Sequence, residues 1–448
     1  MVQPVAFYVT DFRAMHESST HQREMLDLLQ KESFQYFRFE VNPANGLIAD
    51  KTKTGWPASI AAVGLALGAY PVAVERGFIS RAEAVARTLA TLRFFRNSAQ
   101  GPQPDATGYK GFYYHFLDMS TGRRAWKCEL STVDTALLLA GVLSAAAYFR
   151  HECEDENEIV QLADYLYRRV DWQWAADGKA TVSMGWTPAN GFLPSRWAGY
   201  DEALILYILA LGSPTYPLPA ESYRAWGSTY QWREIYGYEC LHAGPLFIHQ
   251  LSHLWVDFRQ IQDAFMRDRR LDYFENSRRA TYVQREYAIR NPLGFERYGD
   301  RCWGLTASDG PGPATRTVRG RRVQFFDYIA RGAPDGPDDG TLAPWAVAAS
   351  LPFAPEIVIP SLEYFIHEVK LKETNPYGFK ATFNPTFSAT GSQGGWISPY
   401  HFGLNVGPIV LMVENYRSEF LWKLMHRCAP IVQGLRRAGF TKGWLEDA

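Results

Sequence analysis

The sequence predicts an all-α fold of six helical hairpins closed into a ring, the (α/α)6 barrel, with short β-hairpins in its rim loops. Apolar residues recur at helical spacing in twelve segments of the 448 residues, whereas strand-like patterns are few and short. No linker or low-complexity stretch interrupts the chain. We therefore expect residues 1–448 to form a single domain.

The twelve expected helices follow one another in adjacent pairs, separated by loops rich in glycine, proline and aromatic residues. Their approximate ranges are 21–39, 57–77, 80–97, 131–151, 156–171, 200–212, 249–265, 271–289, 343–351, 354–372, 404–415 and 417–438. The clearest strand-like runs are 111–116 and 322–326. The longest irregular region, about 290–342, is expected to be functional because loops of that length are uncommon inside compact domains.

In such a ring, alternate helices form an inner layer of parallel helices whose amino termini share one rim. The second, fourth and sixth expected helices begin near Pro57, Ser131 and Tyr200. These three helices therefore belong to the inner layer. Polar residues immediately before them are expected to face one cleft.

Charge and composition exclude two classes of partner. The net charge is −1 and the sequence pI is near 6.8, so the chain lacks the basic character that binds nucleic acid. No unbroken apolar run is long enough to span a membrane. Aromatic residues make up 15% of the chain, with 14 Trp and 25 Tyr. Most should lie in the core, and the excess favours a carbohydrate partner.

Neither a metal nor another cofactor is expected. The five cysteines are scattered and lack CxxC spacing, so they are expected to be free thiols rather than disulfides or zinc ligands. His249 and His253 have the i, i+4 spacing of helical metal ligands but no glutamate follows the first histidine, so packing or substrate binding is favoured. The first 20 residues show no signal-peptide pattern, which predicts a cytoplasmic protein, or a periplasmic one if a leader was removed.

Glu129 and Glu202 are the candidate catalytic residues because each stands where an expected helix begins. Glu129 precedes Ser131 and Asp134, which have capping-box spacing. Asp134 is therefore assigned to the helix cap, and Glu129 remains free of it. Glu202 opens the apolar run 203–209. Glycosidic bond cleavage requires two such carboxyl groups, one to protonate the leaving oxygen and one to act as base or nucleophile.

Each acid also has a simpler explanation. Glu129 could be a solvated loop residue, and the helix dipole alone favours an acid at Glu202. Asp201 is the weaker neighbour because the apolar register does not turn it inward. Aromatic and polar residues near the loop-to-helix junctions are predicted to bind substrate, although Asn405 also suits a helix cap. The predicted binding residues are Trp126, Trp197, Tyr200, Trp303, Asp309, Phe379, Tyr400, His401 and Asn405.

At these segments the chain resembles the bacterial glucoamylase-like domain family. That family includes endo-β-1,2-glucanases of glycoside hydrolase family 144 and a domain of cyclic β-1,2-glucan synthases. The matching stretches are 111–118, 129–138, 198–203, 340–344, 378–381 and 398–405. The resemblance covers about residues 25 to 440. It implies a single (α/α)6 catalytic domain that acts on glucans, with Glu129 and Glu202 matching the family's important carboxylates.

The leading hypothesis is a glycoside hydrolase acting on β-1,2-glucan. Inversion is favoured because Glu129 and Glu202 come from next-but-one inner helices, and inverting enzymes hold their carboxyl groups farther apart. Three alternatives remain open. The same site could catalyse retaining glycosyl transfer, or it could bind a glycan without catalysis. A polysaccharide lyase would use Tyr400 or His401 as the base and Arg259 to neutralise a uronate.

Overall fold

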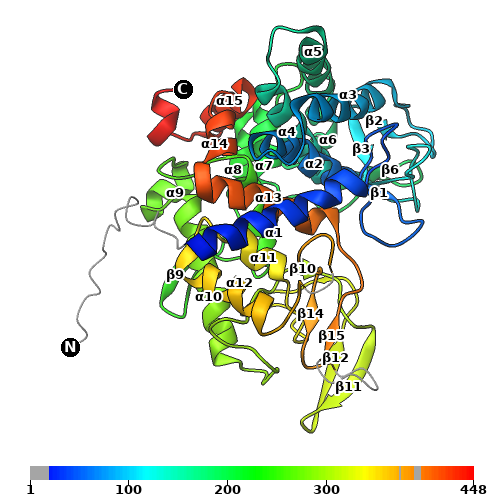
Figure 1. The fold of residues 1–448 in the computed structure, drawn as a ribbon. Helices are drawn as coiled ribbons and strands as arrows, with labels where there is room; N and C mark the ends of the chain where they lie inside the picture. The colour runs from blue at the N-terminus through cyan, green and yellow to red at the C-terminus, as the bar shows by residue number, and fades with distance from the viewer. Residues whose placement is uncertain (1–19, 373–374, 388–394) are drawn as a thin grey trace.

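The computed structural model describes residues 20–372, 375–387 and 395–448. The amino-terminal segment, where no signal pattern is expected, lies outside these ranges except for Thr20. Helices dominate the described chain, as predicted (Figure 1). They are α1 (Thr20–Phe39), α2 (Ile60–Glu75), α3 (Arg81–Asn97), α4 (Thr132–Tyr148), α5 (Glu154–Arg168), α6 (Trp172–Ala176), α7 (Leu204–Gly212), α8 (Ala220–Gly227), η2 (Leu246–His249), η3 (Leu251–Leu254), α9 (Ala264–Arg269), α10 (Tyr273–Arg290), α11 (Pro344–Ala349), α12 (Pro355–His367), α13 (Gly403–Ser418), α14 (Phe420–Met425), α15 (Ala429–Ala438) and η4 (Gly443–Glu446).

The strands are short and most form two-stranded antiparallel pairs. They are β1 (Ala58–Ser59), β2 (Gly108–Tyr109), β3 (Phe112–Tyr114), β4 (Phe116–Leu117), β5 (Leu130–Ser131), β6 (Gly185–Thr187), β7 (Gly191–Phe192), β8 (Trp232–Ile235), β9 (Tyr238–Leu241), β10 (Ala307–Ser308), β11 (Ala314–Val318), β12 (Arg321–Phe325), β13 (Ile329–Ala330), β14 (Phe383–Asn384) and β15 (Trp396–Ile397). The largest sheet has the order β2-β3-β5-β6-β7. The β11–β12 hairpin projects from the helical body (Figure 1).

The central helices contact one another in a closed circuit. α2 packs against α4 and α13, α4 packs against α7, and α7 and α13 both contact η3. α11 packs against α13, and the amide of Gln250, which precedes η3, donates to Ala346 O of α11 at 2.6 Å. Other helices cover this circuit: α3 and α5 lie against α2 and α4, α8 and α15 against α7, and α12 against α11.

Sequence composition explains which helices are central. In α2, every residue from Ile60 to Ala73 is buried, and α7 is buried along its whole length. A helix that is apolar on all sides must be enclosed by other elements. In α15, by contrast, only Ile431, Val432, Gly434 and Leu435 are buried. One hydrophobic cluster extends through the described chain, from Met25 to Leu445.

Two of the predicted helices, 249–265 and 417–438, are not continuous α-helices in the structure. The range 249–265 contains the last residue of η2, the short 3-10 helix η3 and the start of α9 instead of one α-helix. The chain turns out of helical geometry at Gln250 (φ −120°), whose amide bonds α11 instead. The range 417–438 is divided into α14 and α15, and α13 ends at Glu419 in the left-handed conformation (φ 57°). The short helices α6 and α8 were not predicted.

The irregular region near 290–342 contains four strands and a buried ion pair. Arg331 and Asp339 are both fully buried, with Nε and Oδ1 2.8 Å apart. Arg331 also donates to the carbonyl oxygens of Ser308, Phe326 and Asp327. The guanidinium thus satisfies backbone acceptors from both sides of the loop, which holds the β10–β13 segment in one conformation.

α2 and α4 approach each other at two glycines. A Cβ at Gly141 would overlap the backbone carbonyl of Gly64, and a Cβ at Gly64 would overlap the backbone of Leu137. Backbone atoms cannot move aside as a flexible side chain can. The spacing between these two central helices therefore requires glycine at both positions.

We predict that Gly141→Ala lowers the free energy of unfolding by about 1–3 kcal/mol, the usual cost of overpacking a core. Alanine normally favours a helix over glycine, so a loss has to come from the collision with α2. Gly299→Ala is the matched control, because a Cβ there meets only Arg297 O, at 3.9 Å, an ordinary van der Waals contact. Denaturant unfolding of both variants checks this, and an unchanged midpoint for Gly141→Ala contradicts the prediction.

Candidate active site

Short strands bring the amino ends of α2 and α4 together. Ser59 caps α2 and Ser131 caps α4, each accepting a hydrogen bond from a backbone N–H in the first turn of its helix. β1 precedes α2 and pairs with β4, while β5 precedes α4 and pairs with β3. The β3–β5 register places Tyr114 opposite Leu130. His115, the residue that follows β3, therefore lies beside Glu129, the residue that precedes β5.

His115 contacts two carboxylates. Its Nδ1 lies 2.8 Å from Glu129 Oε1, and its Nε2 lies 3.6 Å from Asp134 Oδ2. Its backbone N–H also donates to Glu129 O at 3.0 Å. Asp134 is held in turn by the Ser131 hydroxyl, which donates to Oδ2 at 2.5 Å. The predicted Ser131 cap is confirmed, but the carboxylate of Asp134 also faces the site.

These charges shift both pKa values in the direction expected for an ion pair. Burial alone would lower the pKa of His115, but Asp134, Glu129 and Asp50 raise it to about 9. Burial opposes the ionised form of Glu129, yet the hydrogen bond and charge of His115 lower the pKa of Glu129 below its usual value. Near neutral pH, Glu129 is thus a carboxylate beside an imidazolium.

Glu202 lies in the turn before α7 and not inside its first turn as expected, because α7 begins at Leu204. Asp201 shapes this turn by accepting hydrogen bonds from Ala203 N at 3.0 Å and Trp226 Nε1 at 2.8 Å. Burial raises the pKa of Glu202 to about 8, and the negative charges of Asp201 and Asp134 add to this effect. Glu202 is therefore protonated at neutral pH.

Glu129 and Glu202 belong to one electrostatic environment. Asp134, which lies beside His115 and so near Glu129, also raises the pKa of Glu202. Desolvation by the surrounding residues and the charges of Asp50, Asp309, Asp134 and Glu202 raise the pKa of Tyr328, although the residue as a whole keeps 56% of its surface exposed. The structure therefore brings both predicted catalytic acids to the same group of polar residues, with their pKa values displaced in opposite directions.

Asp309 is held in place from two directions. It is buried and accepts hydrogen bonds from Thr382 Oγ1 at 2.7 Å and Ser398 Oγ at 2.6 Å. Burial raises its pKa, while these hydrogen bonds and the nearby Lys51 lower it. Tyr328, on the segment between β12 and β13, is 56% exposed. Both residues lie in the loop that the buried Arg331–Asp339 pair holds.

An aromatic surface adjoins Glu129. Trp126 is 54% exposed and contacts the rings of Trp56 and Phe116 at centroid distances of 4.6 and 5.1 Å. Trp126 and the following Lys127 both have positive φ (53° and 54°), an unfavourable conformation for bulky residues. Arg124 donates to the carbonyl oxygens of this turn. The chain therefore holds an exposed indole in a strained loop, a feature that clusters at binding sites.

Lys51 places a positive charge beside the same aromatic surface. Its Nζ lies 4.1 Å from the ring centroid of Trp56, 5.0 Å from that of Tyr400 and 5.1 Å from that of Phe402. Phe402 is the residue before α13, so a fourth central helix also starts at this site. The charge of Lys51 lowers the pKa of Asp50, although burial brings it to about 6.

Several predicted binding residues lie in the core instead. Trp303 is fully buried and donates to Ser361 Oγ, and the buried ring of Phe379 packs on Phe365. Trp197 is 7% exposed and donates to Thr132 Oγ1 at 2.9 Å. A sugar ring cannot stack on such enclosed faces. Trp197 instead ties the segment before Glu202 to the start of α4.

The other predicted binding residues are also largely enclosed. Tyr200 is half-buried, with its ring against Tyr230, His249 and Tyr273. His401 is buried, which lowers its pKa to about 3. Asn405 is buried in the first turn of α13, whose N-cap is Phe402, so Asn405 is not the cap. Trp126, Asp309 and Tyr400 are the predicted residues that contact this group of charges and rings.

Sequence reasoning missed a set of polar and aromatic residues at the site. They are Asp50, Lys51, Trp56, His115, Asp134 and Tyr328. His115 lies in the strand-like run 111–116, which was not connected with the site, and Asp134 was assigned wholly to the helix cap. The segment around Asp50 follows the first expected helix and showed no helical or strand pattern. Long-range backbone contacts, including the bridge from Lys51 to Phe402 and the hydrogen bond from Gly403 N to Asp50 O, bring it here.

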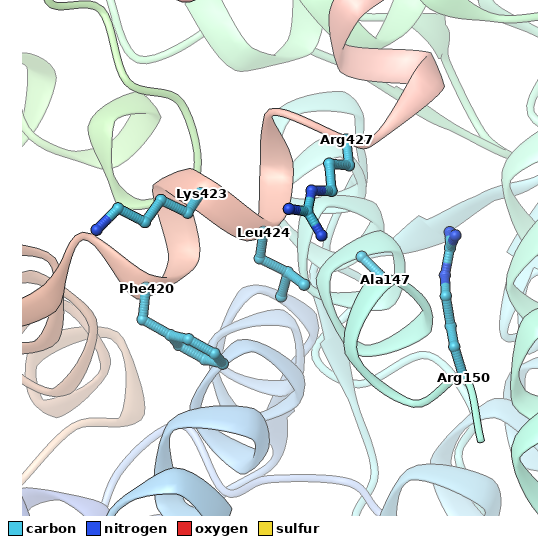
Figure 2. Close-up of a pocket in the computed structure, with 6 residues that line it drawn as sticks. All are labelled: Ala147, Arg150, Phe420, Lys423, Leu424 and Arg427. Atoms are coloured by element: carbon cyan, nitrogen blue, oxygen red, sulfur yellow. The ribbon is translucent and has the colours of Figure 1, made fainter. Parts of the chain in front are cut away.

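A second cleft lies away from these carboxylates. It has a volume of about 300 Å³ and is lined by Ala147, Arg150, Phe420, Lys423, Leu424 and Arg427 (Figure 2). Its lining residue Ala147 is at the carboxyl end of α4 and Arg150 follows that end, whereas Ser131 caps the amino end. A helix of 17 residues is about 25 Å long. This cleft is therefore separate from the candidate site.

Within residues 20–372, 375–387 and 395–448, no cluster of three or more histidine, cysteine or acidic side chains is arranged to hold a metal ion. The five cysteines are free, as predicted. Among the described helices, none is both long and apolar enough to cross a membrane.

Comparison with known proteins identifies the family. Residues 194–429 match the family model Glycoamylase, described as "Putative glucoamylase". The chain belongs to this glucoamylase-like family. It is also similar to a solved "putative glucoamylase" of Bacteroides uniformis ATCC 8492, with 31% identity, a TM-score of 0.83, and coverage of 96% of this chain and 100% of the other.

Two further relatives of this glucoamylase-like chain carry substrate names. One is an endo-β-1,2-glucanase of Chitinophaga pinensis, solved with sophorotriose and glucose, at 26% identity and a TM-score of 0.82, covering 95% of this chain and 100% of the other. The other is the exo β-1,2-glucooligosaccharide sophorohydrolase (non-reducing end) of Parabacteroides distasonis, 28% identical over 449 residues. That match covers 92% of this chain but only 57% of the relative's length.

We predict that Trp126→Ala weakens sophoro-oligosaccharide binding by about 1–3 kcal/mol, because an exposed indole offers a flat apolar face. Its unfolding midpoint should change little. Trp303→Ala is the matched comparison and should destabilise the fold by about 3–5 kcal/mol, as expected for a buried tryptophan. Isothermal calorimetry and denaturant unfolding separate the two effects. Unchanged affinity in Trp126→Ala would remove this residue from the binding site.

Proposed function

We propose that this chain is a glycoside hydrolase that cleaves β-1,2-glucan, with Glu202 as the general acid and Glu129 as the general base. One observation carries the proposal: two carboxyl groups of one site have pKa values displaced in opposite directions, with that of Glu202 near 8 and that of Glu129 lowered. Two carboxyl groups whose pKa values differ in this way supply one proton donor and one proton acceptor at the same pH.

The relatives support the choice of substrate. The sophorohydrolase of P. distasonis and the endo-β-1,2-glucanase of C. pinensis are both named for β-1,2-linked glucose polymers or oligomers. The second of these resembles the chain over nearly the full length of both proteins. We extend the shared substrate class, β-1,2-glucan, to this chain. Because endo and exo attack both occur among these relatives, product size is left to experiment.

We further propose that the architecture is a single (α/α)6 barrel. The closed circuit of α2, α4, α7, η3, α11 and α13, covered by outer helices, supports this arrangement. The single hydrophobic cluster that extends through the described chain supports one domain. In this arrangement the starts of α2, α4, α7 and α13 share one rim, where a glucan would bind.

The proposed reaction is a single displacement. Glu202 gives its proton to the glycosidic oxygen, which leaves with the bonding electron pair as an alcohol. Glu129 accepts a proton from a water molecule, whose oxygen forms the new bond at the anomeric carbon. The two proton transfers balance, and the anomeric configuration inverts. Trp126 provides a stacking face for a glucose unit beside the site, and Tyr328 and Lys51 offer hydrogen-bond donors.

The residue expected to neutralise a uronate in the lyase alternative, Arg259, is engaged elsewhere. Arg259 is engaged in ion pairs with Asp257 and Glu419 and lies over the ring of Trp422. Its charge therefore contributes to the fold. His401, a candidate base for the lyase, is buried.

The test of the proposed function is incubation of the protein with linear β-1,2-glucan, with proton NMR of the first products and chromatography of their sizes. We expect sophoro-oligosaccharides whose new reducing end first appears as the α-anomer. Initial release of the β-anomer would show retention, and products conserving the number of glycosidic bonds would show transglycosylation. Binding without any product would leave only a glycan-binding role. Each of these outcomes overturns part of the proposal.

We predict that Glu129→Gln and Glu202→Gln each lower kcat by at least about 10²-fold, since general acid–base catalysis contributes about 10²–10⁴-fold. Asp201→Asn is the matched control, because Asp201 accepts hydrogen bonds that shape the turn and is assigned no proton transfer. It should lose much less activity. Initial rates on sophoro-oligosaccharides, with circular dichroism to confirm folding, test this. Near-native turnover of Glu202→Gln would contradict the assignment of Glu202 as the general acid.

A further inference from the structure

His115 is the charged group closest to the proposed base, and the proposed reaction gives it no proton to transfer. The ring is half-buried and stacks on Phe116, with centroids 4.0 Å apart and planes inclined by 11°. Stacking on a neighbour restricts rotation of the imidazole. Its two nitrogens are thereby directed at different acceptors, Nδ1 at Glu129 and Nε2 at Asp134.

Both ends of this bridge are anchored by the backbone. Asp134 is fixed at the amino end of α4 by its hydrogen bonds with the Ser131 cap, through its own N–H at 3.2 Å and its Oδ2 at 2.5 Å. Glu129 is fixed in the β3–β5 ladder, where its carbonyl accepts from His115 N. The side chain of Glu129 also packs against Gly185 of β6, whose missing Cβ leaves room for Glu129 Cγ.

We propose that His115 is a positioning residue for the proposed general base: its ring bridges Glu129 and Asp134, and it sets both the orientation and the charge of Glu129. This inference rests on the proposed function but names a residue outside the acid–base pair. The charged form of the ring suits this arrangement, because an imidazolium donates through Nδ1 to Glu129 at 2.8 Å while its positive charge attracts Asp134 at 3.6 Å.

The charges around the pair favour this form. Glu129, Asp134 and Asp50 surround the ring, and together they keep it protonated against the cost of burial. On the other side, His115 and the guanidinium of Arg124 favour the ionised form of Glu129. The direction of the pH dependence of catalysis follows from the pKa shifts of Glu129 and Glu202. The base is active while ionised, so activity is lost as pH falls through the lowered pKa of Glu129 and, at the other limit, as pH rises through the pKa of Glu202 near 8.

Removing the charge of His115 should therefore move the acid limb of the pH profile. His115→Gln keeps a side-chain hydrogen-bond donor but loses the positive charge. We expect the acid limb of kcat/KM to move to higher pH and kcat on the plateau to fall, while the alkaline limb set by Glu202 changes less. His151→Gln is the matched control, because His151 is 70% exposed and pairs with Glu156 outside the site. An acid limb that does not move in His115→Gln overturns the proposal.

A second measurement does not depend on catalysis. The 13Cε1 resonance of His115 in the full chain, assigned by its absence in His115→Gln, should titrate with a midpoint near 9. In Glu129→Gln this midpoint should fall, because a neutral amide replaces one of the carboxylates. A midpoint at or below the ordinary histidine value of about 6.5, or one unchanged in Glu129→Gln, contradicts the proposal even if His115→Gln does not fold.

The two proposals fail separately. A protein that releases no sugar from β-1,2-glucan, yet shows the coupled titration of His115 and Glu129, would contradict the proposed function and retain the bridge. An active hydrolase whose His115 titrates independently of Glu129 would retain the function and exclude the bridge.

Discussion

The close approach of α2 and α4 is the constraint on which the candidate site depends. Gly64 and Gly141 allow the two backbones to touch, and no other residue leaves the needed space. Each helix is capped by a serine that also belongs to a short strand, and these strands lead into the loops that carry Asp50, His115 and Glu129. A change in the spacing of two core helices would consequently displace the charged groups at the rim.

Once these loops are fixed, burial and the neighbouring charges together determine the chemistry. Asp134 influences both halves of the site: it keeps His115 charged, and its negative charge disfavours ionisation of Glu202. Glu129 has a cation beside it, whereas the acid next to Glu202 is Asp201, whose own pKa burial raises to about 7. Two glutamates of the same intrinsic acidity are thereby divided into a carboxylate and a carboxylic acid. Burial strengthens this division because water no longer screens the charges.

Sequence patterns identified the central helices because helices buried on all sides have long apolar runs, as in α2, α4 and α7. They failed at 249–265, where the apolar spacing also looks helical. There the side chain of Gln250 bonds to a helix almost a hundred positions away, and the backbone breaks at that residue. A local pattern contains no information about a partner so distant, so tertiary hydrogen bonding overrode the helical preference.

The sequence by itself determined that the protein is mostly helical, that Ser131 caps a central helix, and that Glu129 and Glu202 stand where two such helices begin. Tertiary structure alone decided which aromatic faces are open: Trp126 is exposed, whereas Trp303 is enclosed, although both stand in similar loops. Tertiary structure also decided which charged groups lie close to one another. Exposure and electrostatic coupling depend on distances in space between residues far apart along the chain, as between Lys51 and Tyr400, and the order of residues does not specify those distances.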